Sequence, residues 1–253
     1  MKLHIDTAPV WEVYRQDHEC PLCAIGDRVE AASVEYFLGD SVMEPSQRIE
    51  VNEKGFCGRH FKLMFDAGNR LGLALMTHTY MKNTLKWLRQ NAESAVAAAT
   101  AEAAKPVFKR VIGKKGERLA VCGDEVLALE DKCVMCERIR DNMKRYIYTI
   151  LYMYKHEPEF PGLLEGSKGM CLKHYAETMK MVPEHLSGEA LKRFVQTLSG
   201  LETDNLQRVA DELEWFTRKF DYRNEDKPWG NSRDAVERSL NKLRGHIVNQ
   251  GRP

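Results

Sequence analysis

Apolar side chains recur every three or four residues along most of the chain, which is the period of an amphipathic helix. The first such stripe ends near Gly39, a residue typical of a helix end, and consists of Ile25, Val29, Ala32 and Tyr36. A stronger stripe in the second half consists of Ile139, Met143, Tyr146, Ile147, Ile150, Leu151 and Tyr154. Each stripe predicts a helix with one face in a packed core.

Two longer stripes predict two longer helices. In the first half the apolar positions are Leu71, Leu75, Met76, Tyr80, Trp87 and Leu88. In the second half they are Leu191, Phe194, Val195, Leu198, Leu206, Val209, Leu213, Phe216 and Phe220. Packed core explains such stripes better than a cofactor pocket does. The sequence therefore predicts an all-α fold.

The chain also contains an internal repeat. Cys20-Pro21-Leu22-Cys23 is followed by the motif Gly55-Phe56-Cys57-Gly58-Arg59-His60-Phe61, with 33 residues between Cys23 and Cys57. Cys133-Val134-Met135-Cys136 is followed by Gly169-Met170-Cys171-Leu172-Lys173-His174-Tyr175, with 34 residues between Cys136 and Cys171. Because both halves share one order of motifs at nearly one spacing, we infer an internal duplication.

The repeat suggests a division of the chain into successive parts. Residues 1–104 form the first helical metal-binding repeat, and 128–253 the second, with the C-terminal helices. Residues 92–104 are rich in alanine, which favours a helix, and Pro106 ends it. Residues 105–127 then form a basic connector, and the expectation is that both repeats pack as one unit.

Each repeat carries three cysteines and one histidine at spacings that suit a metal ion. A Cys-x2-Cys turn places two thiolates near one ion, and Cys-x2-His at a helix start adds a third sulfur and a nitrogen. Such a set suits tetrahedral zinc. The predicted ligands of two ions are Cys20, Cys23, Cys57 and His60 in one repeat, and Cys133, Cys136, Cys171 and His174 in the other.

This ligand assignment keeps each ion inside one repeat, and an exchanged pairing is the alternative. The same residues could instead be buried cysteines without metal, or could hold an iron–sulfur cluster, although clusters more often use four cysteines. A thioredoxin-like dithiol fits poorly, because no strand precedes either cysteine pair. Cys122 has no partner motif, and we interpret it as an ordinary small side chain.

A segment near the C-terminus mixes aromatic residues with both signs of charge. It runs Lys219-Phe220-Asp221-Tyr222-Arg223-Asn224-Glu225-Asp226-Lys227-Pro228-Trp229-Gly230. One interpretation is a loop fixed by Trp229, and the other is a recognition loop in which Tyr222, Arg223 and Trp229 contact a partner.

Charge and hydrophobicity exclude several classes of protein. A formal net charge of +1 makes nucleic acid an improbable partner, since no overall field attracts it. No apolar run is long enough for a transmembrane helix, and charged residues interrupt the N-terminus where a signal peptide would need apolar ones. Cysteines in metal-type pairs also fit a reducing compartment, so we expect a cytoplasmic protein.

The paired motifs CPLC…GFCGRHF and CVMC…GMCLKHY, with the terminal KFDYRN…PWG stretch, resemble an uncharacterised family of bacterial proteins of unknown function. Some of its members are loosely labelled as transporter substrate-binding proteins. The resemblance spans residues 20–245 and implies a bacterial, cytosolic protein, but it implies no activity. Val134 stands where the first repeat has Pro21, which changes the turn but removes no ligand.

These observations favour a zinc-binding helical scaffold or adaptor with two structural sites and a protein partner. Closed four-ligand sites leave no position for a catalytic water, and no recognised catalytic motif occurs in the chain. An iron–sulfur electron-transfer protein is one alternative. An enzyme with a small-molecule pocket between helices is another.

Overall fold

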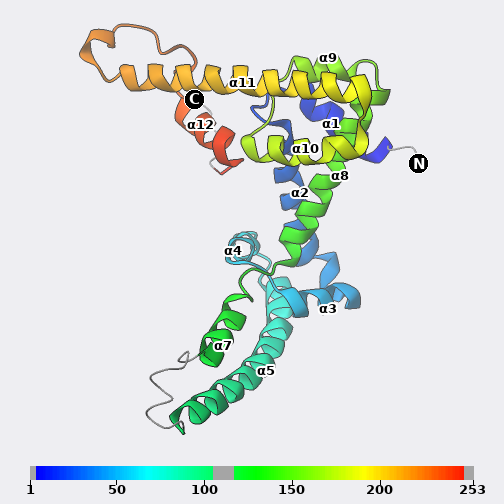
Figure 1. The fold of residues 1–253 in the computed structure, drawn as a ribbon, viewed down its shortest axis with the longest axis vertical. Coiled ribbons are helices and arrows are strands. Elements are labelled where there is room, and N and C mark those ends of the chain that lie inside the picture. Colours follow the sequence, from blue (N-terminus) through cyan, green and yellow to red (C-terminus); the bar gives the residue numbers. More distant parts are fainter. Residues whose placement is uncertain (1–3, 105–116, 248–253) are drawn as a thin grey trace. The chain divides into compact units, whose positions relative to one another are not determined.

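The computed structural model describes residues 4–104 and 117–247, and all regular structure within these ranges is helical (Figure 1). The first half contains α1 (His4–Tyr14), α2 (Pro21–Leu38), η1 (Asp40–Met43), α3 (Pro45–Lys54), α4 (Gly58–Asp66) and α5 (Arg70–Ala103). The second half contains α7 (Glu117–Leu127), α8 (Val134–His156), α9 (Phe160–Glu165), α10 (Leu172–His185), α11 (Gly188–Arg218), η2 (Tyr222–Asn224), η3 (Gly230–Ser232) and α12 (Ala235–Arg244). The predicted all-α fold is confirmed.

The helix ends agree with the local sequence signals. The first predicted helix, α2, ends at Leu38, directly before Gly39. The two stretches predicted around residues 71–88 and 92–104 form one helix, α5, of 34 residues that ends at Ala103. Asn69 caps its start, since the side-chain oxygen accepts a hydrogen bond from the N–H of Gly72 at 3.0 Å.

The compact units differ from the predicted succession of repeats. Unit 1 combines residues 1–29 with 141–253, and unit 2 consists of residues 30–140. The boundaries fall inside α2 and α8, so each repeat contributes to both units. Much of the predicted connector, residues 105–116, lies outside the described residues, and the rest of it forms α7. The packing of the two repeats as one unit stays a prediction.

Unit 1 has its core among α1, α8, α9, α10 and α11. Phe160 of α9 is fully buried between the rings of Trp11 and Tyr14, whose centroids lie at 5.8 and 5.1 Å. Phe194 of α11 packs edge-on against Tyr154 of α8. α12 lies along α11 and returns the chain towards the start of α10 (Figure 1). These contacts bring the loop before α10 next to the start of α2.

Unit 2 has a separate core that contains the second cysteine pair. The ring of Phe56 packs edge-on against the rings of Phe37 and Phe61, with centroid distances of 5.3 and 5.5 Å. The remaining buried members of this cluster are Leu38, Val42, Val51, Met64, Met76, Cys133, Val134 and Met135. α7 packs along α5 in the same unit (Figure 1). Cys133 is therefore built into a hydrophobic core rather than into a surface turn.

Within the described ranges, no helix is both long enough and apolar enough to cross a membrane.

Candidate metal centres

The structure gathers the eight predicted ligands into two groups, but it pairs them differently from our prediction. The first group contains Cys20, Cys23, Cys171 and His174, and the second contains Cys57, His60, Cys133 and Cys136. In each group the cysteine pair of one repeat meets the Cys-x2-His motif of the other. The prediction that each repeat holds its own ion is wrong, and the exchanged pairing is the observed one.

Helix length explains the exchange. α2 has 18 residues and is about 27 Å long, with Cys20 and Cys23 at its beginning. A local site would require the chain to return over this distance before Cys57. The segment between α2 and Cys57 is itself largely helical. Its helix α3 contains 10 residues, and a helix advances only about 1.5 Å per residue. The Cys57 motif therefore remains in unit 2, where Cys133 and Cys136 also lie.

The spacing of the ligand atoms fits a single tetrahedral ion. With Zn–S near 2.3 Å and Zn–N near 2.0–2.1 Å, neighbouring sulfurs should lie about 3.8 Å apart, and sulfur and nitrogen about 3.5 Å. In the first site the Sγ atoms of Cys23 and Cys171 are 3.7 Å apart. The Nδ1 atom of His174 lies 3.3 to 3.5 Å from the three sulfurs.

The second site has the same dimensions. The Sγ atoms of Cys57 and Cys136 are 3.8 Å apart, and Nδ1 of His60 lies 3.2 to 3.4 Å from the three sulfurs. None of the seven cysteines forms a disulfide. In both sites all ligand atoms lie within 4.8 Å of one another, so both groups could hold a metal ion.

The local backbone presents the sulfurs to the ion. Cys57 and Cys171 occupy the N-cap positions of α4 and α10, where the partial positive charge of the helix N-terminus favours a thiolate. Burial raises the pKa of Cys57, but the nearby N–H group of His60 and the neighbouring Cys136 and Cys133 side chains outweigh it, and the pKa is lowered. Within each pair the later N–H donates to the earlier sulfur, as from Cys23 to Cys20 at 3.4 Å.

The thiols themselves favour a cation between them. The hydrogen bond to the Cys171 sulfur raises the pKa of the Cys23 thiol to about 12. Burial and the neighbouring sulfurs raise the pKa of the Cys136 thiol to about 12 as well. Three thiolates at these distances repel one another strongly, and a divalent cation among them removes that cost. The donor set therefore fits a soft or borderline metal ion.

The two loops before Cys57 and Cys171 share a backbone conformation that depends on glycine. Gly55 and Gly169 have φ values of +65° and +72°, a conformation that side chains other than glycine rarely adopt. A Cβ at Gly55 would overlap the Tyr80 ring, and one at Gly169 would lie 2.7 Å from Oε1 of Glu202. The repeated glycine of the motif thus lets the backbone approach a neighbouring side chain closely.

Replacing Gly55 by alanine is expected to lower the free energy of unfolding by at least about 2 kcal/mol. The reasons are the left-handed backbone and the overlap with Tyr80. Thermal unfolding followed by circular dichroism measures the change. Gly58→Ala is the control, since a Cβ at Gly58 meets nothing within 4 Å. Equal melting temperatures for the two variants would contradict this role of Gly55.

Outside the ligand atoms, the first site is held by buried charges that the sequence did not reveal. Nζ of Lys242 donates to the carbonyl oxygens of Lys168 and Met170, directly before Cys171. The carboxylate of Glu202 accepts a hydrogen bond from the Met170 N–H. Burial lowers the pKa of Lys242 and raises that of Glu202 to about 7. A buried lysine and a surface lysine look the same in a single sequence.

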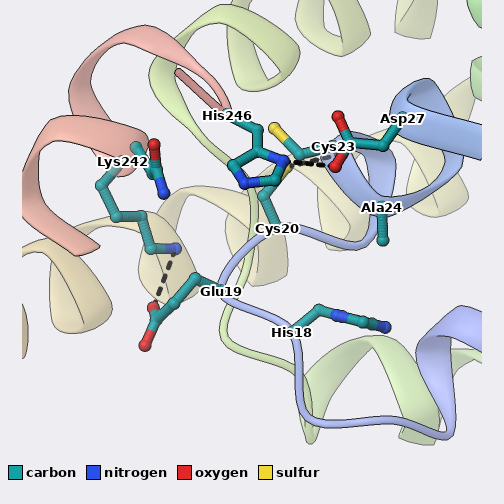
Figure 2. A pocket seen from close by; sticks show the side chains of 9 residues that line it. His18, Glu19, Cys20, Cys23, Ala24, Asp27, Lys242 and His246 are labelled. Atoms are coloured by element: carbon teal, nitrogen blue, oxygen red, sulfur yellow. Dashed lines mark hydrogen bonds and ion pairs between the residues drawn. The ribbon is translucent and has the colours of Figure 1, made fainter. Parts of the chain in front are cut away.

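Glu19, the residue before Cys20, belongs to the same set of buried charged residues around the first site. Glu19 is buried, and its Oε2 accepts a hydrogen bond from Arg208 of α11 at 2.6 Å. Nζ of Lys242 lies 4.0 Å from the same oxygen (Figure 2). Arg208 also pairs with Glu212, which in turn pairs with Arg238 of α12. Both ligand loops of the first site are therefore tied to α11 and α12.

The second site has a different support, which the sequence also did not reveal. The Nε2 atom of His60 lies 3.1 Å from Oε1 of Glu30, so the carboxylate fixes the ring while Nδ1 faces the sulfurs. Arg59 donates to the other oxygen of Glu30 at 2.7 Å. The N–H of Val134 donates to the carbonyl oxygen of Gly55 and joins the two ligand segments directly.

The predicted recognition loop lies apart from the ligand atoms, at the C-terminal end of α11. The ring of Trp229 packs against Phe216 and Phe220, and Arg223 pairs with Asp221. Tyr222 is 84% exposed. Trp229 thus contacts the end of α11 while Tyr222 of the same loop faces solvent, and a role in recognition stays a prediction.

A model of a family of unknown function (DUF6062) matches residues 1–250 of the chain. No curated protein and no solved structure matches it.

Proposed function

Because the chain belongs to a family whose function is unknown, we propose a function from its own residues: a cytoplasmic, zinc-binding helical scaffold or adaptor with two Cys3His sites. The observation that carries the proposal is the tetrahedral spacing of four protein ligands in each site. Four protein ligands complete the coordination of zinc and leave no position for a catalytic water. Each ion then joins the start of one helix to the start of another.

Zinc is favoured over an iron–sulfur cluster by the size of the sites. A cluster distributes its ligands over several iron atoms, so its ligand atoms stand farther apart than around one ion. Metal analysis of purified protein should give two equivalents of zinc and a colourless solution. If the protein instead contains iron and sulfide in comparable amounts and absorbs visible light, an iron–sulfur electron-transfer function would be correct and this proposal would be wrong.

The adaptor function rests on the loop after α11. Phe220 and Tyr222 are 75% and 84% exposed, although large aromatic side chains usually bury more of their surface. Nζ of Lys219 donates to the carbonyl oxygens of Asn224, Glu225 and Lys227, at 2.7 to 2.8 Å. Since the loop is held in place before binding, a partner would lose little affinity to ordering it. We take this partner to be a protein.

Tyr222→Ala is expected to weaken a purified partner's binding by about 1–2 kcal/mol, because exposed tyrosines on fixed loops often dominate interface energies. The unfolding free energy should change by no more than about 0.5 kcal/mol. Isothermal titration with the copurifying partner measures the first value, and thermal melting the second. Met43, which is 83% exposed in unit 2, provides the control variant Met43→Ala. Equal losses in both variants would contradict the role of the loop.

A further inference from the structure

The two histidine ligands differ in what holds their second nitrogen. In the second site the Glu30 carboxylate lies 3.1 Å from Nε2 of His60. In the first site the hydrogen bonds of His174 within the described part of the chain all use Nδ1. A carboxylate on the far nitrogen makes imidazole a stronger metal ligand, and its loss commonly costs ten- to a hundredfold in affinity. The second site should therefore bind its ion more tightly.

A cavity of about 380 Å³ lies over the cysteine pair of the first site (Figure 2). Cys20 and Cys23 form part of its wall, together with Ala24, Asp27 and His246. The imidazole of His246 pairs with the Asp27 carboxylate beside Cys23 (Figure 2). Because two of the four ligand residues, Cys20 and Cys23, line this cavity, a metal ion or a competing ligand could reach the first site through it.

The frame of the first site does not depend on the ion alone. Lys242 and Glu202 hold the backbone around Met170, and Arg208 holds Glu19 beside Cys20. These bonds join the ligand loops to α11 and α12 without using any sulfur or imidazole atom. Loss of the ion should therefore leave the four ligands of this site close together and able to bind an ion again.

These features point to different roles for the two sites. We propose that the first site, formed by Cys20, Cys23, Cys171 and His174, exchanges a thiophilic divalent cation with solution through the cavity, while the second site retains its ion. Exposure of the cysteines does not make this distinction, since the second site has two half-buried cysteines, Cys57 and Cys136, and the first site has only Cys23. The distinction rests on Glu30, while the cavity gives the first ion a route and the frame keeps the emptied first site able to bind again. It also rests on the proposed function, because both sites must bind zinc.

Competition with a chromophoric chelator tests the difference in affinity on the full-length, zinc-loaded protein. One equivalent of zinc should leave first, and the second should require roughly tenfold or more chelator. Glu30→Gln should bring the second step towards the first without moving the first. Glu35→Gln is the matched control, because Glu35 is an exposed carboxylate on the same helix. Release of both ions in one step, or a Glu30→Gln effect on the first step, would overturn the proposal.

Stopped-flow release tests the route. Ala24→Leu narrows the cavity and should slow departure of the first ion several-fold, whereas Ala31→Leu, exposed on the same helix, should not. His246→Ala widens the cavity and should speed the same step. Unchanged rates in both cavity variants would refute the route. Protein that contains no zinc before chelator is added would instead refute the proposed function, so the two failures are distinguishable.

Discussion

Serine in place of Cys57 is expected to unfold unit 2. The substitution leaves the second ion with His60 and two sulfurs, inside a core that includes Cys133 and Phe56. Zinc contributes on the order of 10 kcal/mol to small metal-folded units, and domains have only about 5–15 kcal/mol of stability in total. Even a fraction of the zinc contribution would lower the melting temperature by tens of degrees.

Cys171→Ser should destabilise unit 1 by less, because Lys242 and Glu202 still hold the loop before this residue. Calorimetry of both variants, with a strong chelator added to the parent protein, measures these effects. Cys122→Ser is the control, since this cysteine on α7 belongs to neither ligand group. If the ligand variants melt like the parent protein and lose only a redox or catalytic signal, the sites do not serve to stabilise the fold.

A fragment of residues 30–140 is expected to bind one equivalent of zinc and to fold, whereas residues 1–104 should do neither. The first fragment contains the complete second site with Glu30. The second fragment contains Cys20, Cys23, Cys57 and His60, which belong to two different sites. With half of each ligand set, it has no tetrahedral site to stabilise its helices.

Native mass spectrometry and circular dichroism of the two fragments measure this difference. Residues 141–253 serve as the control, because of the eight candidate ligands they carry only Cys171 and His174, and they should bind no zinc at nanomolar concentration. Tight zinc binding by 1–104 alone would restore the local pairing and contradict the observed one.

The sequence alone determined the all-helical fold, the long helices and the eight residues that gather into the two candidate metal groups. Helical period and Gly39 located α2, and the alanine-rich stretch with Pro106 located the end of α5, because these signals act within a few residues. The ligands could be recognised for the same reason. Two residues between cysteines, or between cysteine and histidine at a helix start, suffice to bring two donors to one ion, whatever the rest of the chain does.

Tertiary structure decided which cysteine pair lies beside which Cys-x2-His motif. The spacing of 33 and 34 residues permits a local or an exchanged site, and the choice depends on where long rigid helices place their ends. It also decided the supports of the sites, since nothing in a single sequence distinguishes Glu30 or Lys242 from a solvated carboxylate or amine. Short-range patterns are set by covalent geometry and helix pitch, whereas burial and long-range pairing follow from how the helices of each unit pack.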